Sequence, residues 1–362
     1  MVFLFNRRQP SNGKATSHKV LLPMDSKMNA KDLYELYDEL DDLDVDLKQP
    51  ANKRVTQKRE SKKREMEAKL FTRAQEASKE FKFTYKAARF EEWWLLDSLV
   101  SFHEHKWIAD VLRRVKGGKE ASVYQCSPGA EVDVPWLAAK VYRPRSLRNL
   151  KNDGLYRIGR TDLDEDGHAL WKEADINAIA KRTRYGEEVR HQSWISYEYV
   201  TMETLHAAGA DVPKPFAKEK NAILMEFIGD AGVAAPPLSH ISLEPDEARP
   251  LFERVIRNLD IMLSKKRIHG DLSAYNILYW DGDIKLIDFP QVVIPESNPS
   301  SWGIFQRDVM RIGQYFMAQG VDCHPKRLAA ELWTAHGHRV FEKVHPKYLD
   351  PDTSEDRQAW EG

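Results

Sequence analysis

The sequence predicts an α+β protein of two lobes, a small β-rich lobe followed by a helical lobe. Short apolar runs separated by turn residues lie between about residues 108 and 229, as expected for strands. After residue 244, leucine and valine recur at helical spacing. With 362 residues the chain is long enough for both lobes. We expect the lobes at residues 91–228 and 229–342, a charged extension at 1–90 and a polar tail at 343–362.

The composition excludes several classes of protein. The chain carries 55 basic and 56 acidic residues, so it has no net charge that would attract nucleic acid or an anionic membrane. Only Cys126 and Cys323 are present, which excludes a disulfide framework and a cysteine metal site and favours a reducing compartment. No apolar run has the length of a signal sequence or a membrane span. We therefore expect a cytoplasmic protein with no membrane partner.

The extension predicts a partly disordered start, then an acidic helix and a basic helix. Acidic residues dominate from Asp25 to Asp46, whereas Lys48 to Arg89 contains fourteen basic and five acidic residues. Residues 52–82 lack glycine and proline, which favours one long polar helix. Contact with ribosomal RNA or a ribosomal subunit is one interpretation. A solvated helix, or one paired with the acidic segment, is the other, and the lack of interleaved aromatic residues favours it.

The small lobe begins with an apolar helix near Phe90 and continues as strand, turn and strand from Ile108 to Cys126. The turn contains Gly117 and Gly118, whose backbone amides could bind an anion, although such a pair also suits an ordinary hairpin. The next strand, from Trp136 to Tyr142, carries one lysine in an apolar run. Because a buried, unpaired ammonium is costly, Lys140 needs an anionic partner.

A helix from Trp194 to His206 offers that partner. Ser146 through Gly167 is rich in charge, glycine and aspartate and predicts a long mobile insertion, which we expect to extend over residues 146–190 before the helix. One stripe of the helix is mostly apolar, with Trp194, Tyr197, Thr201 and Leu205. Glu198 borders the stripe, so it could face Lys140. A buried strand from Ala222 to Gly229 then runs into a break.

The helical lobe places three polar side chains near one another. A helix from Glu244 to Lys266 leads to His269, and Asp271, Asn276 and Asp288 follow. Transfer of a phosphoryl group needs a carboxylate to hold the acceptor and metal ions to neutralise charge. Magnesium prefers oxygen ligands, which Asn276 and Asp288 supply. The alternative is a local turn in which the same side chains only cap the backbone.

Seven groups of residues together resemble the RIO-type atypical protein kinases, over about residues 108–316. They are Lys116-Gly117-Gly118-Lys119-Glu120-Ala121-Ser122-Val123-Tyr124, Ala139-Lys140-Val141-Tyr142, Trp194 with Glu198, Met225-Glu226-Phe227-Ile228-Gly229, His269-Gly270-Asp271-Leu272-Ser273, Ile287-Asp288-Phe289-Pro290-Gln291 and Arg307-Asp308-Val309. The first glycine turn and the Asp-Leu-Ser loop are similar to the type-one branch, and Asp-Phe-Pro-Gln is similar to the type-two branch. The mixture resembles bacterial members, closest to the type-one branch.

The resemblance implies a trimmed kinase-like fold that binds ATP and magnesium, or manganese, between its lobes. It implies that Lys140 holds phosphates, that Glu198 pairs with it, that Asp271 is the catalytic base and that Asn276 and Asp288 bind metal. It also implies that the nucleotide contacts Gly117, Gly118, Lys119, Ser122 and Val123, and that the backbone of Glu226 and Ile228 contacts adenine. Asp308 would anchor the backbone of the catalytic loop.

The implied activity is that of a serine/threonine protein kinase that phosphorylates itself or another protein. An ATPase switch in ribosome assembly, with a transient phosphoaspartate at Asp288, is the main alternative. No Ala-Pro-Glu follows Asp288, so the peptide-docking platform of ordinary kinases is expected to be absent. A nucleotide-binding pseudokinase is disfavoured because the implied catalytic and metal-binding residues are all present, namely Lys140, Asp271, Asn276 and Asp288. A small-molecule phosphotransferase is disfavoured because only about seventy residues follow Asp288.

Overall fold

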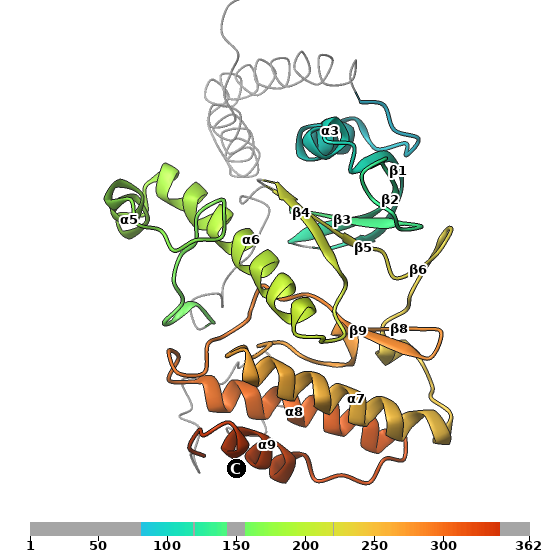
Figure 1. Ribbon diagram of the computed structural model, residues 1–362, viewed down its shortest axis with the longest axis vertical. Helices are drawn as coiled ribbons and strands as arrows, with labels where there is room; N and C mark the ends of the chain where they lie inside the picture. Colours follow the sequence, from blue (N-terminus) through green and yellow to red (C-terminus); the bar gives the residue numbers. More distant parts are fainter. Residues whose placement is uncertain (1–80, 119, 143–155, 220, 341–362) are drawn as a thin grey trace, which may run out of the picture.

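The computed structural model describes residues 81–118, 120–142, 156–219 and 221–340 (Figure 1). Within these residues the chain forms a small β-rich lobe above a helical lobe, which confirms the predicted two-lobed α+β arrangement. The acidic helix, most of the basic helix, Lys119 and the polar tail lie outside the described residues.

The small lobe contains an antiparallel sheet of five strands in the order β1-β2-β3-β5-β4 (Figure 1). Its strands are β1 (Ile108–Gly117), β2 (Ala121–Pro128), β3 (Leu137–Tyr142), β4 (Pro215–Glu219) and β5 (Ala222–Glu226). The predicted strands from Ile108 to Tyr142 are therefore confirmed, with β3 at the centre of the sheet.

The two faces of this sheet have different neighbours because side chains alternate along a strand. On one face, Tyr124, Ala139 and Val141 share a buried cluster with α3 (Arg89–Glu104), the predicted covering helix. Lys140 and Tyr142 point to the other face, toward α6 (Arg184–Ala207). The alternation of β3 thus directs Lys140 toward the space between the lobes.

The small lobe extends further toward the N-terminus than the sequence predicts. Phe81 is fully buried in the same cluster as α3, and the Tyr85 amide donates to the Val111 carbonyl at 2.9 Å. Residues 81–88 are not helical, although the predicted basic helix runs to Lys82. The end of the charged extension is therefore part of the folded lobe.

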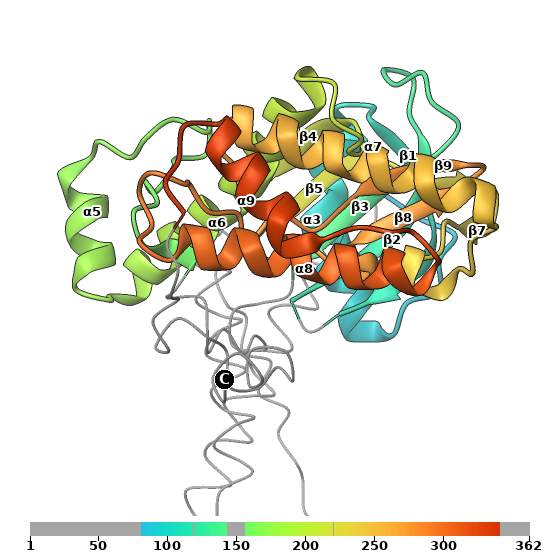
Figure 2. The same ribbon diagram turned by 90° about the horizontal axis from the view of Figure 1, so that it is seen from below.

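The insertion contains structure that its composition does not predict. It includes helix α5 (Glu173–Ala180), and α6 begins at Arg184, ten residues before the expected Trp194. Thr183 explains this early start, because its hydroxyl caps α6 by accepting from the Gly186 amide at 3.0 Å. Figures 1 and 2 show α5 projecting beside α6.

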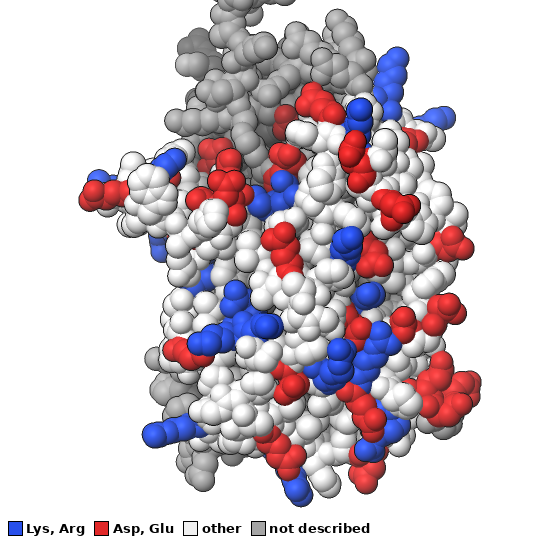
Figure 3. Space-filling model, in the orientation of Figure 1, with Lys and Arg blue, Asp and Glu red and all other residues white. Residues whose placement is uncertain are grey.

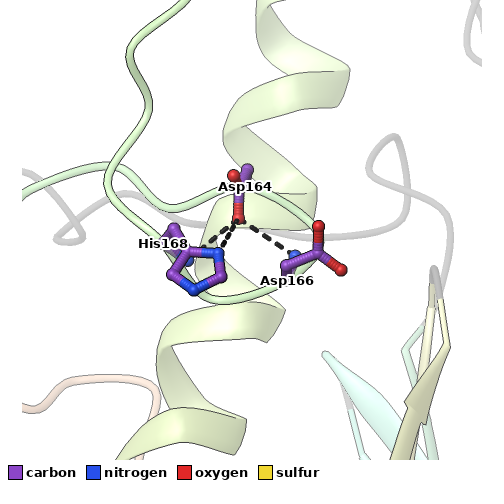
Figure 4. Close-up of side chains that lie close together, drawn as sticks. All are labelled: Asp164, Asp166 and His168. Carbon is purple, nitrogen blue, oxygen red and sulfur yellow. Dashed lines mark hydrogen bonds and ion pairs between the residues drawn. The ribbon is translucent and has the colours of Figure 1, made fainter.

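A tight turn within the insertion, at residues 164–168, is held against α6. The Asp164 carboxylate accepts from the amides of Asp166, at 3.0 Å, and His168, at 2.9 Å (Figure 4). The Leu163 amide donates to the Ser193 hydroxyl of α6 at 2.9 Å. Local side-chain hydrogen bonds, rather than apolar periodicity, therefore fix this part of the insertion.

The helical lobe packs three long helices beneath a hairpin (Figures 1 and 2). Its elements are β6 (Gly229–Asp230), β7 (Val233–Ala234), α7 (Pro245–Ser264), β8 (Ile277–Trp280), β9 (Asp283–Leu286), α8 (Ser301–Ala318) and α9 (Pro325–Ala335). Helix α7 starts with a reciprocal capping box between Glu244 and Glu247. Its expected inward positions are buried, namely Leu251, Val255, Leu259 and Leu263.

Charge is mixed on the face of the molecule that Figure 3 displays. Acidic and basic side chains are interspersed on this face. Among the described residues, no helix combines the length and the apolar character needed to cross a membrane.

Candidate active site

Lys140 pairs with two carboxylates, that of Glu198 within the small lobe and that of Asp288 in the helical lobe. Its Nζ lies 2.6 Å from Glu198 Oε1 on α6 and 2.7 Å from Asp288 Oδ1, just beyond β9. The Tyr142 hydroxyl donates to the other oxygen of Glu198. Glu198 is only 1% exposed and Lys140 is 12% exposed, whereas Asp288 is 46% exposed. The lone lysine of the apolar strand thus has the glutamate partner that the sequence predicts, together with a second carboxylate.

This arrangement fixes the charge states of the group. Burial by itself would lower the pKa of Lys140, but attraction to Asp288 and Glu198 outweighs it and raises that pKa well above its usual value. Burial would raise the pKa of Asp288, and the charge and hydrogen bond of Lys140 reverse this and lower it. Burial, followed by the charge of Glu198, raises the pKa of Tyr142. Near neutral pH, Lys140 and Asp288 are therefore ionised and Tyr142 keeps its proton.

Asp271 lies on a turn that leads from α7 to β8. Its Oδ1 accepts from Arg311 Nη1 of α8 at 3.0 Å, and its side chain is 46% exposed. The Asn276 amide nitrogen donates to the Asp271 carbonyl at 2.8 Å. His269 stabilises the same turn, because its Nδ1 accepts from the Asp271 amide at 3.4 Å while its Nε2 lies 3.1 Å from the Ile287 carbonyl. The proposed base is thus accessible yet held in place.

Helix α8 anchors the backbone of this turn, as expected for Asp308. The fully buried Asp308 accepts from the Gly270 amide at 2.8 Å, and Arg307 donates to the Gly270 carbonyl. Gly270 has a φ of +85°, and a Cβ there would lie 2.2 Å from the Gln291 carbonyl oxygen. Only glycine fits this position without displacing the backbone.

Asn276 and Asp288 have the chemistry of a magnesium site. The nitrogen of the Asn276 amide is used by Asp271, so its oxygen is directed away from that contact. Asp288 is ionised and half exposed, with a φ of +72°, an unusual value for a residue other than glycine. Two oxygen donors on adjoining segments therefore fit a hard divalent cation.

The glycine turn lies between β1 and β2. The Gly118 amide donates to the Ala121 carbonyl at 2.9 Å, and Val123 pairs with Lys140 across the sheet, so the two share a face. Ser122 pairs with Val141 and is buried on the face toward α3. Neighbouring residues of a strand face opposite sides of the sheet, and Ser122 pairs with the neighbour of Lys140. The structure therefore does not bring the Ser122 hydroxyl beside Lys140.

The predicted adenine-binding segment follows β5. The Glu226 amide donates to the Lys214 carbonyl at 2.8 Å, so it is already engaged. The Ile228 carbonyl is engaged as well, because it accepts from the Ala235 amide at 2.9 Å. The Ile228 amide donates to none of the residues that the structure describes, which leaves it for a ligand.

Two contacts at this site are missed by the sequence analysis, those of Tyr142 and Arg311. Tyr142 is two residues after Lys140, so strand alternation could have placed it on the same face. Arg311 is four residues after Arg307, so helical spacing could have placed both toward the catalytic turn.

The segment between Asp288 and α8 is short and mostly buried. It spans residues 289–300 and includes the buried residues Phe289, Val292, Val293 and Pro295. Arg160 of the insertion donates to the Pro290 carbonyl at 3.1 Å. These described residues form no helix or strand.

Comparison with known proteins gives a consistent result. A family model described as the RIO domain matches residues 155–328. The RIO-type serine/threonine-protein kinase Rio1 of Haloferax volcanii is 29% identical over 211 residues, which are 58% of this chain and 63% of that protein. The serine/threonine-protein kinase rio1 of Schizosaccharomyces pombe is 28% identical over 223 residues, 60% of this chain and 40% of that protein. The chain thus matches less than two thirds of the length of these relatives.

A solved structure gives a more distant match. The Rio2 kinase–ADP/Mg²⁺–phosphoaspartate complex of Chaetomium thermophilum aligns with 92% of this chain and 97% of its own, at 18% identity and a TM-score of 0.45.

Proposed function

From the match of residues 155–328 to the RIO domain, we propose that the chain is a RIO-type atypical protein kinase that transfers the γ-phosphoryl group of ATP to serine or threonine side chains. The acceptor is either the protein itself or another protein. The observation that carries this proposal is the Lys140 bridge, which joins the buried Glu198 to the half-exposed Asp288. A lysine fixed by a glutamate beside a metal-binding aspartate is the arrangement that phosphoryl transfer needs.

ATP and magnesium are the proposed cofactors. Lys140 would hold the phosphates, and the amide of Ile228 would hold adenine. Asn276 and Asp288 would hold the metal, which supplies positive charge to the phosphoryl oxygens when bound. Gly117, Gly118 and Val123 would border the phosphates from the β1–β2 turn, whereas the side chain of Ser122 faces α3.

Asp271 would act as the base. The acceptor hydroxyl loses its proton to the Asp271 carboxylate as its oxygen bonds to the γ-phosphorus. The bond from that phosphorus to the bridging oxygen breaks, and ADP retains the electron pair. Asp271 is half exposed, so an acceptor side chain can reach it.

A second function, ATP hydrolysis through a phosphoaspartate at Asp288, is favoured by one observation. Only residues 289–300 separate Asp288 from α8, and most of that short segment is buried. A protein acceptor therefore has little docking surface next to the site, whereas the exposed Asp288 carboxylate is itself a nucleophile.

One experiment separates the two functions. The purified protein, Asp271→Ala and Asp288→Asn are incubated with magnesium and ATP labelled in the γ-phosphate. Label is followed into phosphoserine or phosphothreonine, acyl phosphate and free phosphate. Stable label on a hydroxyl, lost in Asp271→Ala, supports the kinase. Free phosphate formed through a hydroxylamine-sensitive intermediate, lost in Asp288→Asn, supports the ATPase. Tight ATP binding without turnover would refute both and leave a pseudokinase.

Contact with ribosomal RNA through the basic segment is a separate part of the proposal. Because Phe81 and Tyr85 belong to the folded lobe, the deletion that tests it has to end at residue 80. Removing residues 48–80 should weaken binding to RNA and leave ATP turnover intact. Equal RNA binding by both proteins would rule this contact out.

A further inference from the structure

Among the described hydrogen bonds, three side chains of helix α8 bind the catalytic turn, two of them through its backbone. Arg307 and Asp308 bind the carbonyl and the amide of Gly270. The third contact joins Arg311 Nη1 to Asp271 Oδ1 at 3.0 Å. Arg311 thus touches the side chain that would receive the acceptor proton.

We propose that Arg311 is a positioning residue that fixes the carboxylate of Asp271 so that its Oδ2 faces the acceptor hydroxyl. This inference rests on the proposed phosphoryl transfer. Arg311 acts through Asp271 and is not itself required to touch the substrate.

The burial of the pair makes the contact specific. Arg311 is 14% exposed, so most of its side chain is packed against the lobe, whereas Asp271 is 46% exposed. A packed guanidinium loses little further freedom when it binds a carboxylate, and its rigid plane restricts how that carboxylate can turn. Partial burial also reduces screening of the pair by salt. An exposed arginine would hold the carboxylate far less firmly.

The two oxygens of Asp271 are consequently not equivalent. Oδ1 is bound by Arg311 at 3.0 Å. Oδ2 has the Asn276 amide nitrogen at 3.4 Å, which is long for a hydrogen bond, while that nitrogen lies 2.8 Å from the Asp271 carbonyl oxygen. Oδ2 is therefore the oxygen with free acceptor capacity. It would take the proton as the acceptor oxygen bonds to phosphorus and ADP departs.

The test compares wild-type protein with Arg311→Gln, Arg311→Lys and Arg311→Ala. Arg327→Gln is the matched control, because Arg327 also pairs with a carboxylate, Glu331 at 2.7 Å, but on the exposed face of α9. For each protein, phosphoryl transfer at saturating ATP and magnesium, the affinity for ATP and the melting temperature are measured.

We expect Arg311→Gln to reduce the rate at saturating ATP by about 10². The affinity for ATP should stay within about twofold of wild type, because the contact described for Arg311 is with Asp271 and not with Lys140 or Asp288. Arg311→Lys should recover part of the rate. Added guanidinium ion should raise the rate of Arg311→Ala but not that of Asp271→Asn, and Arg327→Gln should match wild type.

Several outcomes would overturn the inference. One is a wild-type rate in Arg311→Gln. Another is a parallel loss of rate, ATP affinity and melting temperature that neither lysine nor guanidinium restores, which would mean a purely structural role. If wild-type protein transfers no phosphoryl group, the proposed function fails and the inference fails with it. If wild-type protein transfers phosphoryl groups and the Arg311 variants do so at the same rate, the proposed function stands and only the inference fails.

Discussion

The carboxylates of Glu198 and Asp271, on either side of the space between the lobes, differ in how completely the protein hydrogen-bonds their oxygen atoms. Glu198, behind the small-lobe sheet, is buried and bonded to both Lys140 and Tyr142. Asp271, on the helical lobe, is 46% exposed and has one oxygen bound by Arg311. The first group is built into the fold and the second is left open for a substrate.

This difference predicts different consequences of mutation. Removing a partner from a buried ion pair leaves an uncompensated charge, so both stability and function should fall. Removing an accessible base should cost function and little stability. The following predictions test this contrast, starting with the largest effect.

Lys140→Met should have the largest effect. It leaves Glu198 buried without its cation, so we expect the free energy of unfolding to fall by about 3 kcal/mol and phosphoryl transfer to fall by at least about 10³. Urea unfolding and single-turnover assays measure the two effects. A variant as stable as wild type would contradict the view that Glu198 depends on Lys140.

Asp271→Asn should remove activity without this loss of stability. We expect transfer to fall by about 10³, and the free energy of unfolding to change by less than about 1 kcal/mol because the Arg311 pair is partly exposed. ATP affinity, measured by titration calorimetry, should not change. A stability loss as large as that of Lys140→Met would remove the distinction between the two regions.

Tyr142→Phe isolates the second hydrogen bond of Glu198. One oxygen of a buried carboxylate loses its donor, so we expect a loss of about 1–2 kcal/mol in the free energy of unfolding. Because Lys140 remains, ATP affinity should fall less than in Lys140→Met. Ser122→Ala is a suitable control in the same sheet, since Ser122 lies on the face toward α3. A wild-type stability for Tyr142→Phe would mean that water replaces the phenol.

The smallest effect concerns pH. Because the Lys140 contact lowers the pKa of Asp288 in the folded protein, folding gains stability above the unfolded value of about 3.9 and loses it as pH falls through the lower folded value. The contribution should be below about 1 kcal/mol because Asp288 is 46% exposed. Asp288→Asn cannot titrate, so its difference in unfolding free energy from wild type should be constant from pH 5 to 8 and shrink below about pH 4. A difference that grows in acid would contradict a lowered pKa of Asp288.

Sequence reasoning predicted the pairing of Lys140 with Glu198 because it depends on local patterns. A single lysine in an apolar strand requires an anion, and the helix after the insertion supplies Glu198 at its border. The same reasoning did not place the side chain of Ser122, because its face of the sheet depends on strand register. Ser122 and Lys140 lie on opposite faces because of strand pairing, which the sequence of one strand does not contain.

The insertion and α8 show the other limits. Residues 156–183 fold through capping and turn hydrogen bonds such as those of Asp164 and Thr183, which leave no hydrophobic period to detect. Arg311 reaches Asp271 across about forty residues of sequence, so its contact depends on how α8 packs under the turn. Helical periodicity gives the face of Arg311 but not its partner.

The crowding at Gly270 has a consequence for regulation. In ordinary kinases the corresponding His-Arg-Asp motif has an arginine at this position, and arginines receive the phosphate when activation loops are ordered by phosphorylation. Here the Gln291 carbonyl occupies the space of even a methyl group. A phosphate added between Asp288 and α8 would therefore find no arginine at residue 270 to bind it. An arginine would fit at this position only if the backbone at residue 270 and the backbone at Gln291 moved apart.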